Sequence, residues 1–170
     1  MADVHEVILF FHLAGVFVFL IAHGTSGAVG FRLRREREPA KVAALLEISG
    51  STLPAMGVGW ILILVTGIAL GVETWLGGGT RFGWFYASLV IFIVLTAMMT
   101  PLSQGYVKAR AALGVKPSMV SAKSWTKTLA KGYTRDKLDE YLGEANAMAL
   151  AAVGFGGILV LVFLMMFKPF

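Results

Sequence analysis

The sequence contains no cysteine, and charged residues make up only 15% of its 170 positions. Without cysteine, the chain has no disulfides, thiolate zinc sites, iron–sulfur clusters or cysteine nucleophile. Soluble domains carry about 25% charged residues, so the low charge argues against an ordinary soluble domain. The hydrophobic fraction is 57%, and the mean hydropathy is +0.76. Together these values predict a membrane protein.

Recognisable enzyme signatures are also missing. The apolar segments hold no nucleophile elbow, phosphate-binding loop or carboxylate pair. We therefore predict no catalytic residue, and we leave enzyme activity open while favouring a protein that is not an enzyme. A cleavable signal peptide is not expected either, because Asp3 and Glu6 stand where a positive region should be.

Four apolar segments are long enough to cross a membrane, which takes roughly 20 residues of helix. They cover approximately residues 7–31, 53–76, 84–104 and 145–167. None alternates with the period of two that a barrel strand requires. The predicted fold is therefore all-α, a bundle of four transmembrane helices that forms one integral membrane domain over residues 1–170.

Lysine and arginine are concentrated in the two connections at 32–52 and 105–144, which hold 13 of the 15. By the positive-inside rule, both connections face the cytoplasm and both termini face outward. This placement explains the net charge of +5 without nucleic acid, and it favours a bacterial-type inner membrane. In the second connection, Lys123, Lys127 and Lys131 recur every four residues. This spacing suits either an amphipathic helix on anionic lipid headgroups or a solvated helix packed on the bundle.

The first connection has clear helix signals. We expect the first helix to continue to about Arg37 and the chain to break at Pro39. A short helix then follows over residues 40–48, before Ser51 and Thr52 as N-caps of the second span. Glycines such as Gly67 and Gly71 are spaced to let helices approach closely, either within the bundle or between copies.

The only three histidines, His5, His12 and His23, all lie in or near the first span. They project within roughly 20° of one line along a helix, and His12 and His23 are about 16 Å apart along its axis. One small ligand cannot bind both, so they form two separate sites or one site and one structural residue. We expect both rings to face protein, with Thr66 and Ser88 at the depth of His12 and Glu73 near His5.

Candidate ligands other than histidine lie in the half of the bundle near His23. We expect four methionines at this depth, namely Met56, Met98, Met99 and Met148. Thioether with imidazole suits Cu(I) and also a haem with histidine and methionine as axial ligands. The sequence therefore offers His12 and His23 as cofactor-binding residues, and His23 with these methionines as a metal site. Methionine is also an ordinary filler of helix interfaces, so the absence of any cofactor is an equally open reading.

Several stretches resemble small bacterial integral membrane proteins allied to the copper-resistance D protein. They are "FHLAG" in the first span, the basic exit "RLRRER", then "STLPAMGVGWILILVTGIALG" and "GWFYASLVIFIVLTAMMTP". The four-helix membrane protoporphyrinogen oxidase looks like a more distant relative. The resemblance covers about two-thirds of the chain and matches His12 to the first-helix histidine of those proteins. It implies an association with haem b or copper.

Two classes of function follow from these observations. In the first, the protein binds haem b or copper through first-helix histidines, for membrane redox chemistry or metal handling. In the second, it is a ligand-free accessory subunit of a larger membrane assembly. The expected partners are the bilayer, with its anionic headgroups at the cytoplasmic face, and other membrane subunits or further copies of the chain.

Overall fold

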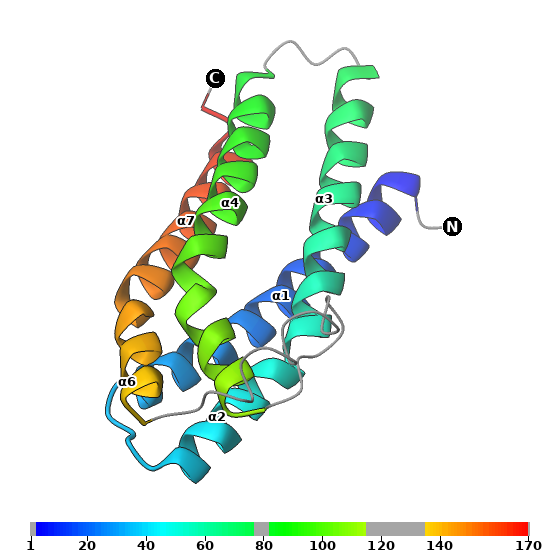
Figure 1. The fold of residues 1–170 in the computed structure, drawn as a ribbon. Coiled ribbons are helices and arrows are strands. Elements are labelled where there is room, and N and C mark those ends of the chain that lie inside the picture. The colour runs from blue at the N-terminus through cyan, green and yellow to red at the C-terminus, as the bar shows by residue number, and fades with distance from the viewer. Residues whose placement is uncertain (1–2, 77–81, 115–134, 170) are drawn as a thin grey trace.

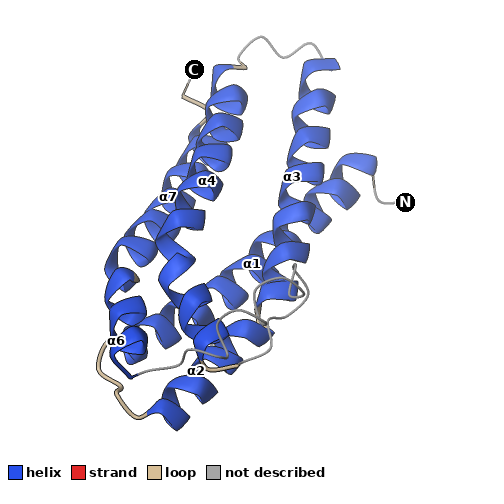
Figure 2. Cartoon of the chain, viewed as in Figure 1, coloured by secondary structure: helices blue, strands red, loops and turns tan. Residues whose placement is uncertain are grey.

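The computed structural model describes residues 3–76, 82–114 and 135–169, most of which are helical (Figures 1 and 2). The helices are α1 (Val4–Leu33), α2 (Pro39–Ser51), α3 (Leu53–Leu76), α4 (Gly83–Ala112), α6 (Arg135–Glu144) and α7 (Ala147–Phe167). Within these ranges, four helical stretches are long and apolar enough to cross a membrane. They contain the four predicted spans, which confirms an all-α arrangement. The predicted helix around Lys123, Lys127 and Lys131 lies outside the described residues.

The long helices form two pairs, α1 with α3 and α4 with α7 (Figure 1). The short helices α2 and α6 lie at the same end of the molecule. We call it the basic end because the arginine-rich segment after α1 lies there. The other end, where α3 stops and α4 begins, is called the far end. α1 runs obliquely to α3 and α4, whereas α4 and α7 lie side by side.

Glycine permits the close crossing of α1 and α3. A Cβ atom on Gly59 would lie 2.8 Å from the backbone nitrogen of Phe19 and 2.9 Å from the carbonyl oxygen of Gly15. A Cβ on Gly15 would in turn lie 2.8 Å from the Cβ of Leu62. Small residues let helix backbones meet in lipid, where apolar burial provides little driving force. The two glycines therefore fix where α1 crosses α3.

We expect Gly59→Ala to lower the free energy of unfolding by about 1–3 kcal/mol, because backbone atoms stand where the methyl group must go. Gly57→Ala is the matched control on the same helix, since its Cβ would meet nothing within 4 Å. This control should be neutral or stabilising by up to about 1 kcal/mol. Unfolding of both variants in detergent measures the difference, and equal stability would refute the close crossing.

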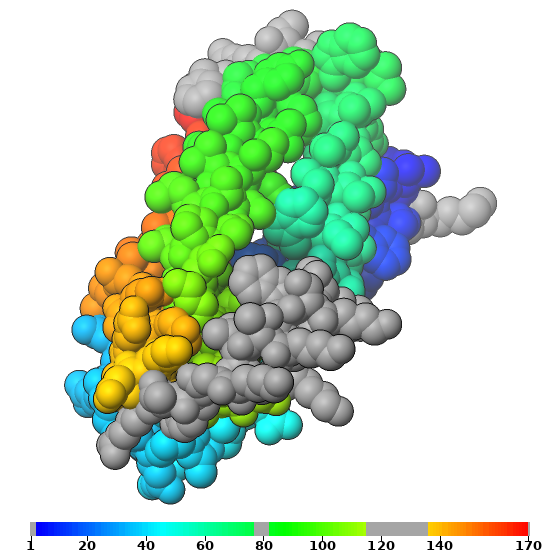
Figure 3. All heavy atoms as spheres, viewed as in Figure 1, coloured from blue at the N-terminus to red at the C-terminus, as the bar shows by residue number. Residues whose placement is uncertain are grey.

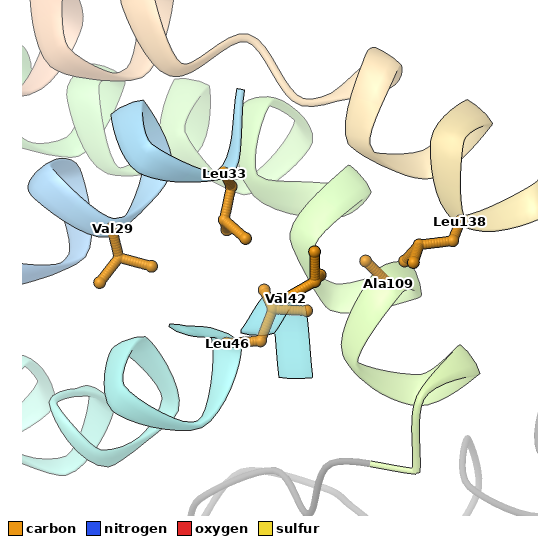
Figure 4. Packing of buried hydrophobic residues seen from close by; sticks show 6 residues of the cluster. All are labelled: Val29, Leu33, Val42, Leu46, Ala109 and Leu138. Atoms are coloured by element: carbon orange, nitrogen blue, oxygen red, sulfur yellow. The ribbon is translucent and has the colours of Figure 1, made fainter. Parts of the chain in front are cut away.

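The buried apolar core lies at the basic end, where α1, α2, α4 and α6 meet. Its members are Val29, Leu33, Val42, Leu46, Ala109 and Leu138 (Figure 4). Elsewhere the long helices carry many exposed apolar side chains, such as Ile21, Val65 and Leu159. This distribution suits helices surrounded by lipid, whose apolar side chains need no burial in protein.

The connection from α1 to α2 differs from its prediction at the start and agrees at Pro39. α1 ends at Leu33 rather than near Arg37. The Arg37 guanidinium donates to the carbonyl oxygens of Leu33 and Glu36, at 3.5 and 2.8 Å. Backbone N–H groups of Glu38 and Arg37 donate to the Glu36 carboxylate, and they hold its pKa below the ordinary value. Pro39 opens α2 after an extended Glu38, as the restriction on residues before proline requires.

Ser51 and Thr52 do not cap α3, contrary to the prediction. Their hydroxyls donate backward, to the carbonyl oxygens of Ile48 and Ser49 at 2.8 and 2.9 Å. Only Thr52 separates α2 from α3, and its backbone stays in the right-handed helical region. The chain is therefore almost continuously helical here. Asn146, in contrast, does cap α7, because its side chain accepts from the N–H of Ala149 at 2.9 Å.

Candidate functional site: a cavity containing His12

A cavity of about 310 Å³ lies in the far half of the molecule, between the two helix pairs. α3 and α4 stand side by side on the face seen in Figure 3, and both contribute to its wall with α1 and α7. Most of the lining is apolar, including Leu89, Phe92 and Leu161. The polar side chains around it are few. Apolar lining with a few polar groups is typical of small-molecule sites, which usually measure about 300–1,000 Å³.

His12 is the more deeply buried of the two histidines that line this cavity, the other being His5. Its side chain comes from α1, its residue is only 5% exposed, and its Nδ1 lies 3.0 Å from the Thr66 hydroxyl oxygen of α3. Gly67 provides the room, because a Cβ there would lie 3.2 Å from Cε1 of the ring. The prediction that His12 faces protein at the depth of Thr66 is confirmed.

Thr66 also determines the tautomer of His12. The single hydroxyl proton of Thr66 is donated to the carbonyl oxygen of Leu62. The hydroxyl oxygen must therefore accept from His12, which places the imidazole proton on Nδ1. The Ile63 backbone also hydrogen-bonds to the ring. In the tautomer set by Thr66, Nε2 carries the lone pair that can bind a metal or accept a hydrogen bond. Ligating histidines commonly have their second nitrogen held in this way.

Ser88 and Thr74 provide further polar atoms in the cavity wall. The Ser88 hydroxyl donates to the carbonyl oxygen of Trp84 at 2.7 Å, and that of Thr74 donates to Leu70 at 2.8 Å. Both protons are thus used within their own helices. The two oxygens act toward the cavity as hydrogen-bond acceptors.

Charged groups lie where the cavity reaches the far end. His5 Nδ1 is 2.8 Å from a Glu73 carboxylate oxygen, which links α1 to α3 as the sequence predicted. Lys168 follows α7 in a left-handed conformation with φ of 42°, and its Nζ lies 5.1 Å from the centre of the Trp84 ring. The cavity is thus apolar in its interior and charged at its mouth.

His23 has a different environment, between α1 and α7. Its ring stacks on Phe19 at 5.6 Å and meets Phe155 edge-on at 5.4 Å. His23 Nε2 and the terminal carbon of Met99 both lie within 3.0 Å of the point where a Cβ of Gly154 would sit. In the described chain, His23 has no hydrogen-bond partner comparable to Thr66. His23 therefore faces protein, as predicted, and it shares the space beside Gly154 with Met99, one of the predicted methionines.

The other predicted methionines are not grouped with His23 to the same degree. Met98 and Met148 are 45% and 57% exposed, and Met56 is half-buried on α3. Their role as metal ligands stays a prediction. Over the described residues, no group of three or more histidine, aspartate or glutamate side chains is placed to hold a metal ion.

One methionine that the sequence did not single out lies in the wall with His12. Met165 comes from α7, and its neighbour Met166 is 72% exposed. The run "LMMF" gives no sign of which methionine faces inward. The packing of α7 against α4 decides this, and that packing is not visible in the hydrophobic pattern.

A second polar cluster occupies the basic end. Arg110 of α4 is 7% exposed and donates to the Leu46 carbonyl oxygen at 3.1 Å and to the Ser49 hydroxyl at 2.8 Å. Ser49 donates to Ser26 at 3.3 Å, and Ser26 lies 2.9 Å from the Thr52 hydroxyl. The cluster joins α1, α2 and α4 through a buried guanidinium. In the sequence, Arg110 is distinguished only as one of the basic residues of the second connection.

Comparisons with family models, with curated proteins and with solved structures find no match. The chain is a small integral membrane protein. Four long apolar helices and a lipid-compatible surface carry that conclusion. The relation to the copper-resistance D protein therefore rests only on the similarity of the short stretches quoted above.

Proposed function

We propose that this membrane protein binds one lipophilic cofactor in the cavity between its helix pairs, and that His12 is the anchoring ligand. The observation that carries the proposal is the imidazole of His12, held through Nδ1 by Thr66 and lining an apolar cavity. A buried polar group in the membrane interior is costly unless it has a use or a partner. With Thr66 on Nδ1, we assign the lone pair of Nε2 to the ligand.

Haem b is the cofactor we propose. The residues present suit it, because His12 offers a neutral imidazole and Met165 offers a thioether in the same cavity wall. The apolar lining matches the chemistry of a porphyrin ring, and Lys168 at the mouth carries the charge that attracts propionate groups. Haem supplies one-electron redox chemistry when it is bound. The chain itself would bind the group, orient it through His12 and exclude water.

Copper at His23 is the second candidate, favoured by the proximity of His23 and Met99. One imidazole and one thioether form a set of soft ligands suited to Cu(I). An accessory role without a ligand is the outcome to accept if neither haem nor copper binds. In that case, the protein should copurify with larger membrane subunits.

Filling the cavity tests the proposed site. We expect Leu89→Trp to abolish saturable binding of added haem, because Leu89 lines the cavity wall. Val90→Trp is the matched control, since the adjacent Val90 is 59% exposed and faces away from the buried side of α4. Haem titration of the detergent-purified variants, followed through the Soret band, measures this. Equal binding by both variants would place haem outside the cavity.

A further inference from the structure

The arginine-rich exit of α1 forms a hollow of about 490 Å³, separate from the His12 cavity. It is lined by Phe31, Arg32, Arg34 and Arg35. Phe31 is 40% exposed, and its helix belongs to the first candidate membrane span, Val4–Leu33. The hollow therefore places an exposed aromatic ring beside three guanidinium groups where the span ends.

These guanidinium groups are poorly neutralised by the described part of the chain. Arg32 approaches the Glu36 carboxylate only at 4.0 Å. That carboxylate already accepts the backbone N–H groups of Arg37 and Glu38 at 3.1 and 3.2 Å. Arg34 and Arg35 form no ion pair with any described carboxylate. The hollow thus carries a local excess of positive charge.

Neighbouring cations at the same end are used differently. Arg37 turns back to donate to backbone carbonyls and lies 3.9 Å from Asp139. Lys41 pairs with Glu38 at 2.5 Å, and Lys108 pairs with Glu144 at 2.7 Å. Arg37, Lys41 and Lys108 thus form contacts within the protein, whereas the three arginines of the hollow are largely available to a ligand.

We propose that this hollow binds the phosphate of an anionic phospholipid. Arginine presents a planar fork of donors that matches phosphate oxygens. Basic pockets beside a membrane span are suited to anionic headgroups. Phe31 supplies the apolar contact that a lipid glycerol and acyl chain would make and that free phosphate would not. The site is independent of haem, copper and the His12 cavity.

The test is calorimetric titration of the full-length protein in neutral detergent. The probes are short-chain phosphatidylglycerol, the matching phosphatidylcholine and inorganic phosphate. We expect saturable binding of phosphatidylglycerol, no saturable binding of phosphatidylcholine, and weakening of the former by added salt. Absence of a headgroup preference would overturn the proposal. Binding of inorganic phosphate as tight as that of the lipid would assign a free phosphate site instead.

Variants locate the site within the protein. Arg34→Gln combined with Arg35→Gln should weaken phosphatidylglycerol binding by about tenfold or more, since each basic residue near anionic lipid contributes roughly 1 kcal/mol. The control, Lys41→Gln combined with Lys108→Gln, removes the same charge at the same end and should retain most of the affinity. If both double variants lose the same affinity for phosphatidylglycerol, the binding reflects general electrostatic attraction to the basic end. That result would overturn the assignment to the hollow. Phe31→Ser should weaken the binding of phosphatidylglycerol but not that of inorganic phosphate. Unchanged lipid affinity in this variant would also contradict the proposal.

Discussion

We expect His12→Ala to weaken haem binding by at least about 100-fold. Loss of a residue that merely orients a ligand costs 10–100-fold, and His12 is proposed as the ligand itself. Haem titration of the detergent-purified protein measures the affinity. Imidazole added to the variant should restore a low-spin spectrum, because the small ligand can occupy the space that the ring leaves. A folding defect alone would not be rescued in this way.

His23→Ala is the control for this experiment. His23 lies between Phe19 and Phe155 with its Nε2 near Gly154, away from the His12 cavity wall. Haem affinity should therefore stay unchanged in His23→Ala. If haem is lost in His23→Ala and retained in His12→Ala, the two assignments must be exchanged. Copper bound by the protein and lost only in His23→Ala would favour the second candidate function.

We expect Arg110→Met to lower the free energy of unfolding by about 2–4 kcal/mol. Methionine retains much of the side-chain volume, but it leaves the Leu46 carbonyl and the Ser49 hydroxyl without their shared donor. Each buried polar group that loses its partner costs roughly 1–3 kcal/mol. The loss falls at the basic end, where the apolar core joins α1, α2, α4 and α6. Unfolding in detergent, followed by circular dichroism, measures it.

Lys108→Met is the matched control for Arg110, two residues earlier on the same helix. The Lys108 side chain is 37% exposed and pairs with Glu144 at 2.7 Å. Exposed pairs of this kind contribute about 0–1 kcal/mol. The control should therefore remain close to the unsubstituted protein. If Lys108→Met destabilises as much as Arg110→Met, the buried network has no special role.

The sequence predicts the four spans well because a bilayer demands long apolar helices, and this demand is visible in composition alone. Depth along the helices also predicts two pairings across α1 and α3. Counting residues placed Thr66 near His12 and Glu73 near His5, and both contacts are present. Such pairings follow from the regular rise of a helix.

Crossing angles are what the sequence pattern does not reveal. His12 and His23 share one line along α1, yet His12 contacts α3 while His23 packs against Gly154 of α7. Because α1 runs obliquely, the same face of this helix contacts α3 at His12 and α7 at His23 (Figure 1). Gly15 and Gly59 set that course through a close contact between backbones. The cavity, which both α1 and α3 line, depends on the same angle.

Arg110 was missed for a different reason. The sequence predicts that the third span ends near residue 104, whereas α4 continues to Ala112. The extension carries Arg110 into the space beside α2, where carbonyl and hydroxyl oxygens replace water around the guanidinium. A basic residue just beyond a span is ordinarily exposed. Only the packing of α2 against α4 shows that this one is buried.

The most direct test of the central claim is the absorption spectrum of the full-length protein, purified in mild detergent and then titrated with haem. We expect a saturable Soret band at one haem per chain, with the sharp visible bands of a low-spin complex after reduction. Protein that stays colourless as purified, and shows no saturable band in the titration, would contradict the assignment of His12 as a haem ligand.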